Sequence, residues 1–347
     1  MASKRMMIGN TAVGGGAPVT IQSMTNTDTR DAVRTTEQIL SLENAGCEIV
    51  RFSVYDEDCA ASIPYIKAHT HIPLVADIHF DHRLAIAAIE NGIDKVRINP
   101  GNIGSEQKVR ELVAAAKDRN IPIRIGVNGG SLEKDILRKY GVTPEGMLES
   151  ALSHVAILEK CGFYDIVISM KASTVQKTVQ ANRLASKRTP YPLHLGVTEA
   201  GMGEAAMVKS SIGIGSLLLD GIGDTIRVSL TGDPVREVYA AKRILAAVGL
   251  RSEGVEVVSC PTCGRTRVDL ASIVKKVEES LPETDKSLRI AVMGCAVNGP
   301  GEAREADIGI AFGSKNAVVF KKGELCYSDK LPEVVDRFIS DVKSELQ

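Results

Sequence analysis

The segment IPLVADIHFDHRLAIAAIENGIDKVRIN, residues 72–99, contains the repeating unit from which the fold of this chain is predicted. Its two ends, 72–80 and 94–99, are short runs rich in apolar residues and bounded by turn residues, as expected of buried parallel strands. The stretch between them has apolar residues at spacings of three and four, which indicates an amphipathic helix. Gly92 stands where such a helix would end. The segment therefore predicts a strand–helix–strand unit.

The same alternation extends in both directions, from about residue 17 to residue 250. Helix-start patterns separate the apolar runs; Thr143-Pro144 and Asp233-Pro234 each pair an N-cap residue with a proline at the first helical position. The predicted strands are 19–24, 48–54, 72–80, 94–99, 121–128, 164–170, 191–197 and 224–230. Eight strand–helix units in roughly 230 residues predict a (β/α)8 TIM barrel, with an extra turn or short helix inserted at 129–141.

The pattern changes after Gly249. Further strands are expected at 288–295 and 307–313 and in a hairpin centred on Lys322-Gly323, and helices at 269–283 and 331–346. Strands that alternate with helices over so short a length are typical of a small α+β domain. The sequence therefore predicts two domains, a barrel of residues 1–250 and an α+β domain of residues 251–347.

The charge balance gives no sign of a polyanionic or membrane partner. Lys and Arg number 42 against 43 Asp and Glu, so the net charge of −1 would not attract the whole chain to nucleic acid or anionic lipid. No apolar run is long enough to cross a membrane, and the N-terminal stretch lacks the apolar core of a signal peptide. Seven cysteines, an odd number, argue against a disulfide framework. We therefore expect a cytoplasmic protein.

Three cysteines at the ends of apolar runs form a candidate metal site. Cys260 and Cys263 form a C-x-x-C motif directly after one run, and Cys295 ends a second. The glycines around them permit a tight backbone whose N–H groups can face bound sulfide. Thiolates suit both an iron–sulfur cluster and a structural zinc ion, so the fourth ligand has to distinguish the two.

The residues available as a fourth ligand favour the cluster. A closed zinc site usually takes a fourth Cys or a His, but no histidine follows His194, and Cys326 lies in the predicted hairpin. Glu302 follows Cys295 by seven residues, in a glycine-rich turn. A carboxylate is a weak and exchangeable ligand, which suits a cluster that binds substrate. A zinc knuckle that staples a small domain is the alternative.

Catalytic side chains of a (β/α)8 barrel lie at the carboxyl ends of the strands. The predicted ends carry mostly polar groups, namely Arg51, Asp77, His79, Arg97, Asn99, Arg124, Asn128, Lys171, Glu199, Arg227 and Ser229. Four of these are arginines within or beside apolar runs, where a guanidinium without an anion is costly to bury. Arginine binds phosphate oxygens in pairs, and lysine adds a point charge. Four arginines and a lysine therefore predict a binding site for a diphosphate.

The same residues also fit purely structural roles. The arginines could be salt-bridged to carboxylates in the core. Glu199 is either an acid/base group or a solvated loop carboxylate. Asp77 and His79 are expected to point to the same face of the barrel, where they would orient hydroxyl groups, relay a proton or form a purely structural pair.

Eight segments spread over nearly the whole chain resemble the family of 4-hydroxy-3-methylbut-2-en-1-yl diphosphate synthases. They are IQSMTNTDTRD (21–31), AGCEIVRFSV (45–54), VRINPGN (96–102), PIRIGVNGGSL (122–132), ISMKAS (168–173), HLGVTEAG (194–201), SCPTCGRT (259–266) and MGCAVNGPGEA (293–303). In combination, the last two are highly specific for this family.

The resemblance implies a barrel that binds 2-C-methyl-D-erythritol 2,4-cyclodiphosphate and a small domain, similar to the sulfite-reductase-like fold, that holds a 4Fe–4S cluster. It implies Cys260, Cys263, Cys295 and Glu302 as cluster ligands, Arg51, Arg97, Arg124, Lys171 and Arg227 as diphosphate ligands with Asn99, Asn128 and Ser229 nearby, and Glu199 as acid/base. The implied reaction is a two-electron ring opening with loss of water, in isoprenoid biosynthesis, with ferredoxin or flavodoxin as electron donor. The short linker resembles the two-domain form of the family, for which a head-to-tail homodimer is expected.

Two rival functions fit some of these residues. The first is a barrel lyase or aldolase that uses Lys171 as a Schiff base and carries a zinc-stapled tail; the arginines argue only for phosphate and do not exclude it. The second is an iron–sulfur electron carrier, which would not need a full barrel with polar strand ends.

Overall fold

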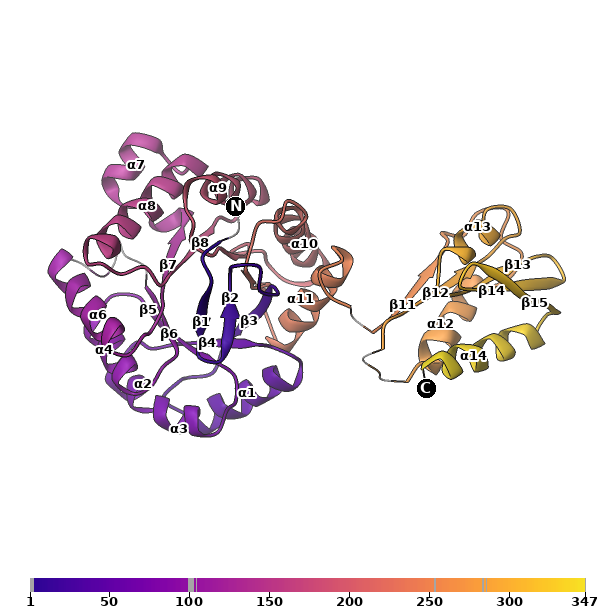
Figure 1. The fold of residues 1–347 in the computed structure, drawn as a ribbon, viewed down its shortest axis with the longest axis horizontal. Coiled ribbons are helices and arrows are strands. Elements are labelled where there is room, and N and C mark those ends of the chain that lie inside the picture. Colours follow the sequence, from indigo (N-terminus) through magenta and orange to yellow (C-terminus); the bar gives the residue numbers. More distant parts are fainter. Residues whose placement is uncertain are drawn as a thin grey trace. The chain divides into compact units, whose positions relative to one another are not determined.

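The computed structural model describes residues 3–98, 103, 105–252, 254–282, 284 and 286–346. The chain separates into two compact units, Met1–Arg251 and Ser252–Gln347, and each is described by itself (Figure 1). Among the described residues, no helix combines the length and the apolar character that a membrane crossing requires.

Eight parallel strands form the wall of the first unit. Along the sheet their order is β8–β7–β6–β5–β4–β3–β10–β9, and a parallel bridge between Ile168 and Leu193 brings β8 beside the start of β9. The strands are β3 (Thr20–Met24), β4 (Ile49–Ser53), β5 (Leu74–Ile78), β6 (Lys95–Ile98), β7 (Ile123–Asn128), β8 (Ile166–Lys171), β9 (His194–Leu195) and β10 (Thr225–Ile226). The predicted barrel is confirmed, and each strand overlaps its predicted run.

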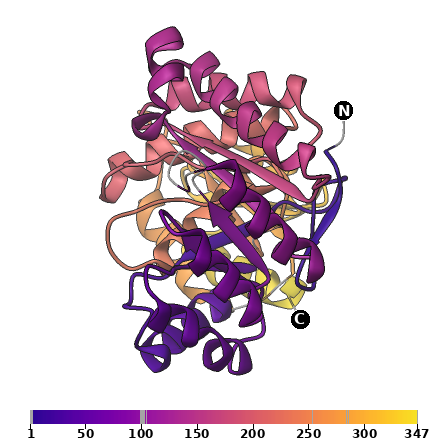
Figure 2. The same ribbon diagram turned by 90° about the vertical axis from the view of Figure 1, so that its left-hand side faces the viewer.

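Helices form the outer layer of the barrel (Figures 1 and 2). They are α1 (Ala32–Asn44), α2 (Glu57–Ala61), α3 (Ile63–Ala68), α4 (His82–Glu90), α6 (Glu106–Asp118), α7 (Lys134–Tyr140), α8 (Pro144–Lys160), α9 (Val175–Arg188), α10 (Gly203–Leu219) and α11 (Val235–Ala247). The insertion predicted between β7 and α8 consists of a 3-10 turn, η1 (Gly129–Ser131), followed by α7. Thr143 caps α8 as predicted. Helix α11 begins one residue later than predicted, with the Asp233 carboxylate accepting from the N–H of Val235.

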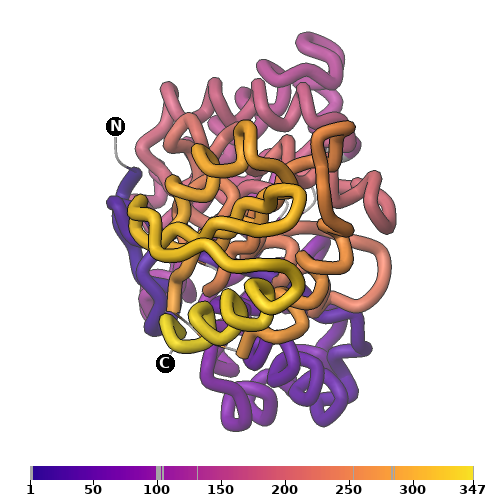
Figure 3. The backbone as a smooth tube through the Cα atoms, turned by 90° about the vertical axis from the view of Figure 1, so that its right-hand side faces the viewer, coloured from indigo at the N-terminus to yellow at the C-terminus, as the bar shows by residue number. Residues whose placement is uncertain are grey.

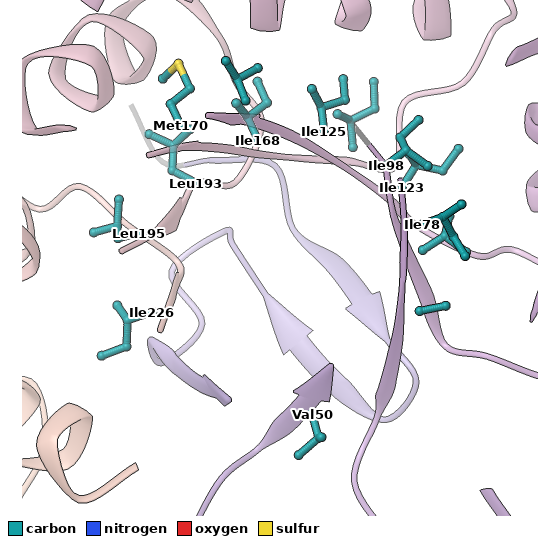
Figure 4. Close-up of a cluster of buried hydrophobic side chains, with 14 of the residues drawn as sticks. Val50, Ile78, Ile98, Ile123, Ile125, Ile168, Met170, Leu193, Leu195 and Ile226 are labelled. Carbon is teal, nitrogen blue, oxygen red and sulfur yellow. The ribbon is translucent and has the colours of Figure 1, made fainter. Parts of the chain in front are cut away.

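Side chains along the barrel strands alternate between two different environments. Those that point outward are apolar and pack against the helices; Figure 4 shows Val50, Ile98 and Ile168 among them. Those that point inward are largely polar, and on neighbouring strands they stand side by side, as Arg97 and Arg124 do in β6 and β7. Most barrels of this type fill their interior with branched apolar residues. The polar interior of this barrel is therefore the first structural sign of a binding function.

A hairpin that the sequence analysis did not predict covers the amino-terminal end of the barrel (Figure 1). Strands β1 (Met6–Ile8) and β2 (Thr11–Val13) pair antiparallel. Their buried side chains pack against Ile49, Val75 and Val167 on the barrel strands. Strands of three residues are too short to produce a recognisable alternation in the sequence. The resulting apolar plug separates the polar interior from solvent at this end.

The second unit is built on one mixed sheet with the order β11–β12–β13–β14–β15. Its strands are β11 (Val255–Ser259), β12 (Leu288–Met293), β13 (Ile308–Phe312), β14 (Asn316–Lys321) and β15 (Glu324–Lys330). The first three run parallel, and the last two are added antiparallel. The predicted hairpin is confirmed, because Lys322 and Gly323 connect β14 to β15 with φ of 49° and 83°, values that suit a tight hairpin turn.

Helices cover both faces of this sheet; Figure 3 follows the chain through them in orange to yellow. They are α12 (Leu270–Ser280), α13 (Gly299–Arg304) and α14 (Glu333–Leu346). Ile290 and Val292 of β12 share a core with α12 and α14, whereas Ala291 and Met293 face α13 on the other side. Helix α13 corrects the expectation of a turn around Glu302: buried Ala303 gives this short segment an apolar face against β13.

Candidate active site

The inward face of the barrel carries more positive than negative charge. Its cationic side chains, here called the cationic cradle, are Arg51, Lys95, Arg97, Arg124, Lys171 and Arg227. Within the described parts of the chain, only two carboxylates form ion pairs with them, those of Asp77 and Glu237. Buried charge without a partner is strongly unfavourable. The excess of cations therefore favours the entry of an anion.

Asp77 organises one side of the cradle. Its carboxylate lies 2.9 Å from Arg97 Nη1 and 3.6 Å from Arg51 Nε, and His79 Nε2 lies 3.6 Å away. Burial pushes the pKa of Asp77 upward, but the charge of Arg51, the hydrogen bond from His79 and the charge of Arg97 outweigh it and hold the pKa well below its usual value. Asp77 is thus ionised and keeps two arginines side by side, with His79 next to its carboxylate.

Arg227 has a carboxylate partner of its own. Its Nε and Nη2 donate to Glu237 on α11 at 3.2 and 3.3 Å. Glu237 is buried and also accepts from Ser23 Oγ at 3.1 Å and from the N–H of Leu230 at 3.0 Å. A salt bridge in the protein core therefore compensates the charge of Arg227, as the salt bridges with Asp77 compensate the charges of Arg51 and Arg97.

The remaining cations have neutral neighbours instead. Arg124 donates at 3.4 Å to the amide oxygen of Gln22, and its Nε has no partner among the described residues. Lys171 Nζ lies 3.2 Å from His194 Nε2. Lys95 Nζ lies 3.5 Å from the same amide oxygen of Gln22. Burial, reinforced by the neighbouring arginines, lowers the pKa of both Lys171 and Lys95 well below the usual value. An incoming anion would stabilise the charged forms of these groups most.

Two glycines make room for the cradle. A Cβ on Gly126 would lie 2.3 Å from Arg97 Nε, and one on Gly196 would lie 2.7 Å from the carbonyl oxygen of Arg227 and 2.9 Å from Lys171 Nζ. Real Cβ atoms are essentially never found so close to another heavy atom. A larger residue would therefore displace Arg97 at the first position, and the backbone of Arg227 and Lys171 at the second. The inward glycines of β7 and of the segment after β9 thus belong to the site.

The other predicted residues lie where the strands end. Asn128 is the last residue of β7, and Ser229 follows β10; both are half-buried. Glu199 is exposed and has a φ of 53°, a left-handed conformation that is uncommon outside glycine and occurs often at functional sites. His79 is exposed beside its buried partner Asp77. Asn99 lies outside the described residues.

Four polar residues of the interior were missed in the sequence analysis. Lys95, Gln22 and His194 occupy inward positions in β6, β3 and β9. Lys95 and His194 stand two residues before Arg97 and Gly196, and Gln22 stands two residues before Met24, whose sulfur contacts the guanidinium of Arg51. The strand period of two could have identified these three. Glu237 gives no such signal, because a glutamate in the first turn of a helix is usually a solvent-exposed dipole partner.

In the second unit, the cysteine segments meet at the carboxyl ends of β11 and β12. Cys260 follows β11, and its Sγ accepts a hydrogen bond from the N–H of Gly294, directly after β12, at 3.2 Å. A Cβ on Gly294 would lie 2.9 Å from Thr266, so glycine permits the two loops to touch. The N–H of Cys263 donates to Thr266 Oγ1 at 3.1 Å, which closes the turn of the C-x-x-C loop.

Cys295 is surrounded by backbone donors. Hydrogen bonds from the N–H groups of Val297, Asn298 and Gly299 lower the pKa of its thiol. Cys263 is exposed, Cys260 and Cys295 are partly exposed, and Glu302 is exposed on α13. Within the described ranges, no three Cys, His, Asp or Glu side chains are gathered in a metal-binding group, so the predicted ligand set remains a prediction.

The donors nevertheless fit a thiolate-bound cluster. The segments provide soft sulfur ligands, backbone N–H groups turned toward sulfur, and an exposed carboxylate. Cys326 is exposed on β15, at the opposite edge of the sheet from β11. This separation leaves Cys260, Cys263 and Cys295 as the thiols of the candidate site.

Solved structures show the fold alone. The N-acetylneuraminic acid synthetase of Leptospira borgpetersenii superimposes with a TM-score of 0.52 at 14% identity, over 80% of this chain and 96% of that one. The dihydropteroate synthase of Yersinia pestis gives a TM-score of 0.50 at 11% identity, over 70% and 98% of the two chains.

Curated relatives are much closer in sequence. This chain is 58% identical to the 4-hydroxy-3-methylbut-2-en-1-yl diphosphate synthase (flavodoxin) of Caldanaerobacter subterraneus subsp. tengcongensis, over 98% of this chain and 96% of the relative. It is 57% identical to the protein of the same name from Clostridium perfringens, over 99% and 98%. Residues 3–242 match the family model of the GcpE TIM-barrel domain, and residues 256–344 match that of the GcpE protein C-terminal domain. With both parts of the chain matched in this way, the chain belongs to the GcpE family.

Proposed function

We propose that this enzyme converts 2-C-methyl-D-erythritol 2,4-cyclodiphosphate to 4-hydroxy-3-methylbut-2-enyl diphosphate in isoprenoid biosynthesis. The relatives carry the name of that synthase. The observation that carries the proposal is the cationic cradle, in which Arg124 and Lys171 have no carboxylate partner among the described side chains. A cyclic diphosphate supplies linked phosphate oxygens, and these are the acceptors that such a set of donors lacks.

In this proposal each part of the barrel site has a role. Arg51, Arg97, Arg124, Lys171 and Arg227 bind the diphosphate, with Asn99, Asn128 and Ser229 beside it. Asp77 fixes the two arginines it contacts and, with His79, orients the hydroxyl groups of the substrate. Glu199 delivers protons, since the ring opening consumes two electrons and two protons and releases one water.

The proposed cofactor is a 4Fe–4S cluster on Cys260, Cys263, Cys295 and Glu302. When bound, the cluster would pass on, one at a time, the two electrons that the ring opening requires and that the external electron donor delivers. The three thiols hold it with the help of backbone N–H groups, and Glu302, as a carboxylate, is its weakest ligand. Zinc is the less suitable occupant, because no histidine follows His194 in the sequence.

The partners follow from the same proposal. Flavodoxin, named in the relatives, or ferredoxin donates the electrons. Two copies of the chain assemble head to tail, so that the cluster domain of one serves the barrel of the other. The free cysteines of the described chain suit a reducing cytoplasm, where thiols remain available as ligands.

Metal analysis and turnover test the cofactor and the activity together. Anaerobically purified protein should contain iron and acid-labile sulfide and reduce the cyclic diphosphate with dithionite as electron source. Zinc in place of iron and sulfide would refute the cofactor, and a cluster without turnover would support the rival electron carrier. Borohydride trapping of Lys171 with a carbonyl substrate would support the rival aldolase.

A pair of cysteine variants sharpens this test. Cys263→Ser should lose most of the iron and all turnover, because an alcohol is a poor ligand for iron held by thiolates. Cys326→Ser is the matched control and should retain both, since Cys326 lies at the far edge of the sheet. Equal iron contents in the two variants would contradict the proposed ligand set.

A further inference from the structure

Behind Lys171, two buried hydrogen bonds form a chain across neighbouring strands of the barrel. Lys171 Nζ lies 3.2 Å from His194 Nε2, and His194 Nδ1 lies 2.6 Å from Thr225 Oγ1. His194 and Thr225 have no exposed surface, so neither side chain can bind substrate from solvent. Any effect of these two residues on the reaction is therefore indirect, and Lys171 is the cation of the cradle with which His194 forms a hydrogen bond.

The chemistry of the two ends assigns the protons in this chain. With the diphosphate of the proposed function bound, Lys171 is an ammonium group, which has only N–H donors, so His194 Nε2 accepts from Lys171. The neutral ring then carries its proton on Nδ1 and donates it to Thr225 Oγ1. A protonated His194 would place two cations in contact; burial and the charges of Arg124 and Lys171 indeed lower the pKa of His194 well below its usual value.

We infer that His194, held in one tautomer by Thr225, is a positioning residue that fixes the Lys171 ammonium toward the diphosphate. The inference rests on the proposed role of Lys171 as a diphosphate ligand. Lysine has a flexible four-carbon stem whose ordering costs free energy when a ligand binds. Gly196 lies beside the Lys171 amine but has no side chain that could hold it in place. The hydrogen bond to His194 therefore restrains the amine. A lysine ordered before binding raises the affinity for the substrate.

The neighbouring strand provides a matched control. Thr20 stands opposite Thr225 in the register of β3 and β10, and it is also buried. Its Oγ1 has no hydrogen-bond partner among the described residues. Thr225→Val and Thr20→Val therefore remove the same hydroxyl group at nearly constant volume, but only Thr225→Val removes the acceptor of His194 Nδ1.

The experiment is a double-mutant cycle on the affinity of the holoenzyme for 2-C-methyl-D-erythritol 2,4-cyclodiphosphate, measured by calorimetry without reductant. Thr20→Val should bind within about twofold of wild type, and Thr225→Val roughly tenfold more weakly, because a hydrogen bond that supports a charged group is lost. In a Lys171→Met background, Thr225→Val should cause no further loss. Nitrogen NMR of labelled histidine should show His194 protonated on Nδ1 in wild type and altered in Thr225→Val.

The possible results separate this inference from the function on which it rests. Equal affinities of the two threonine variants, or a tenfold effect that persists with Lys171→Met, would overturn it. A normal affinity of Lys171→Met alone would refute the diphosphate role of Lys171 and the inference with it. If Thr225→Val does not fold, His194→Gln, which keeps an acceptor, should bind more tightly than His194→Leu; equal binding by these two would also overturn the inference.

Discussion

At the scale of single residues, the cationic cradle contains two kinds of positive charge. Arg51, Arg97 and Arg227 are compensated by carboxylates within the protein. Lys95, Arg124 and Lys171 have neutral acceptors instead, the amide oxygen of Gln22 for the first two and an imidazole nitrogen for Lys171. The first kind stabilises the fold of the barrel, and the second leaves N–H donors for the proposed diphosphate. The same residue type thus serves stability in one strand and binding in the next.

Asp77 should contribute more to stability than any surface carboxylate. Asp77→Asn removes the partner of two buried arginines, so the free energy of unfolding should fall by about 3 kcal/mol at pH 7. The pKa of Asp77 is depressed in the folded state, so its contribution is complete above the unfolded pKa of about 4 and declines as the pH falls further. Urea unfolding of wild type and variant at pH 7, 5 and 3.5 measures the difference.

The control for this experiment is Asp81→Asn. Asp81 pairs at 2.6 Å with Arg83, whose side chain is 79% exposed, and an exposed pair contributes less than about 1 kcal/mol. A difference between wild type and Asp77→Asn that stays constant down to pH 3.5 would contradict the depressed pKa, and a difference as small as that for Asp81→Asn would contradict the structural role.

At the scale of elements, glycines decide how closely helix and strand approach. In α10, Gly213 faces Val197 of the segment after β9, where a Cβ would lie 2.5 Å from a methyl group. Gly215, two residues further along the helix, has Val248 as its nearest neighbour, at 3.8 Å. Helix α10 approaches Val197 closely only at Gly213, so it needs glycine at only one of these two positions.

These two glycines form a matched pair of tests. Gly213→Ala should lower the free energy of unfolding by about 1–3 kcal/mol, because the added methyl group overpacks the contact with Val197. Gly215→Ala should raise it by up to about 1 kcal/mol, since alanine is the better helix former and the space is free. Urea unfolding measures both, and destabilisation of equal size in the two variants would contradict the packing described for α10.

At the scale of the whole molecule, the proposed function needs a barrel and a cluster domain in one active site. In the proposal the barrel provides the donors for the diphosphate, and the second unit provides the cysteines. The proposed head-to-tail dimer would place these two groups on different copies of the chain. Each dimer would then have two composite sites, as expected of an assembly with twofold symmetry.

Mixing two inactive variants tests this arrangement. Lys171→Met impairs the barrel, and Cys295→Ser impairs the cluster domain. In a hybrid dimer, one site would combine the intact barrel of one chain with the intact cluster domain of the other, so an equimolar mixture should regain about a quarter of wild-type activity after subunit exchange. Turnover with dithionite measures it, and activity no higher than that of the separate variants would indicate that each chain serves its own barrel.

Local patterns in the sequence predicted most of the architecture, apart from the short hairpin of β1 and β2 and from helix α13. The period of two in strands and the spacing of three and four in helices reflect which face of each element is buried, and they predicted the barrel and the α+β unit. They also predicted that Arg51, Arg97 and Lys171 lie at the carboxyl ends of barrel strands. The cysteine motifs identified the candidate cluster loops, because the ligand chemistry resides in the residues themselves.

The partners of those residues were decided by tertiary structure alone. Glu237 reaches Ser23 across 214 residues, and Arg124 reaches Gln22 across 102. Such contacts form only when the barrel closes, because closure brings strands together that no local pattern connects. The sequence thus determined which elements form and which side chains face inward. Only the folded barrel decided which cations are neutralised and which, such as Lys171 with His194 behind it, remain available for an anion.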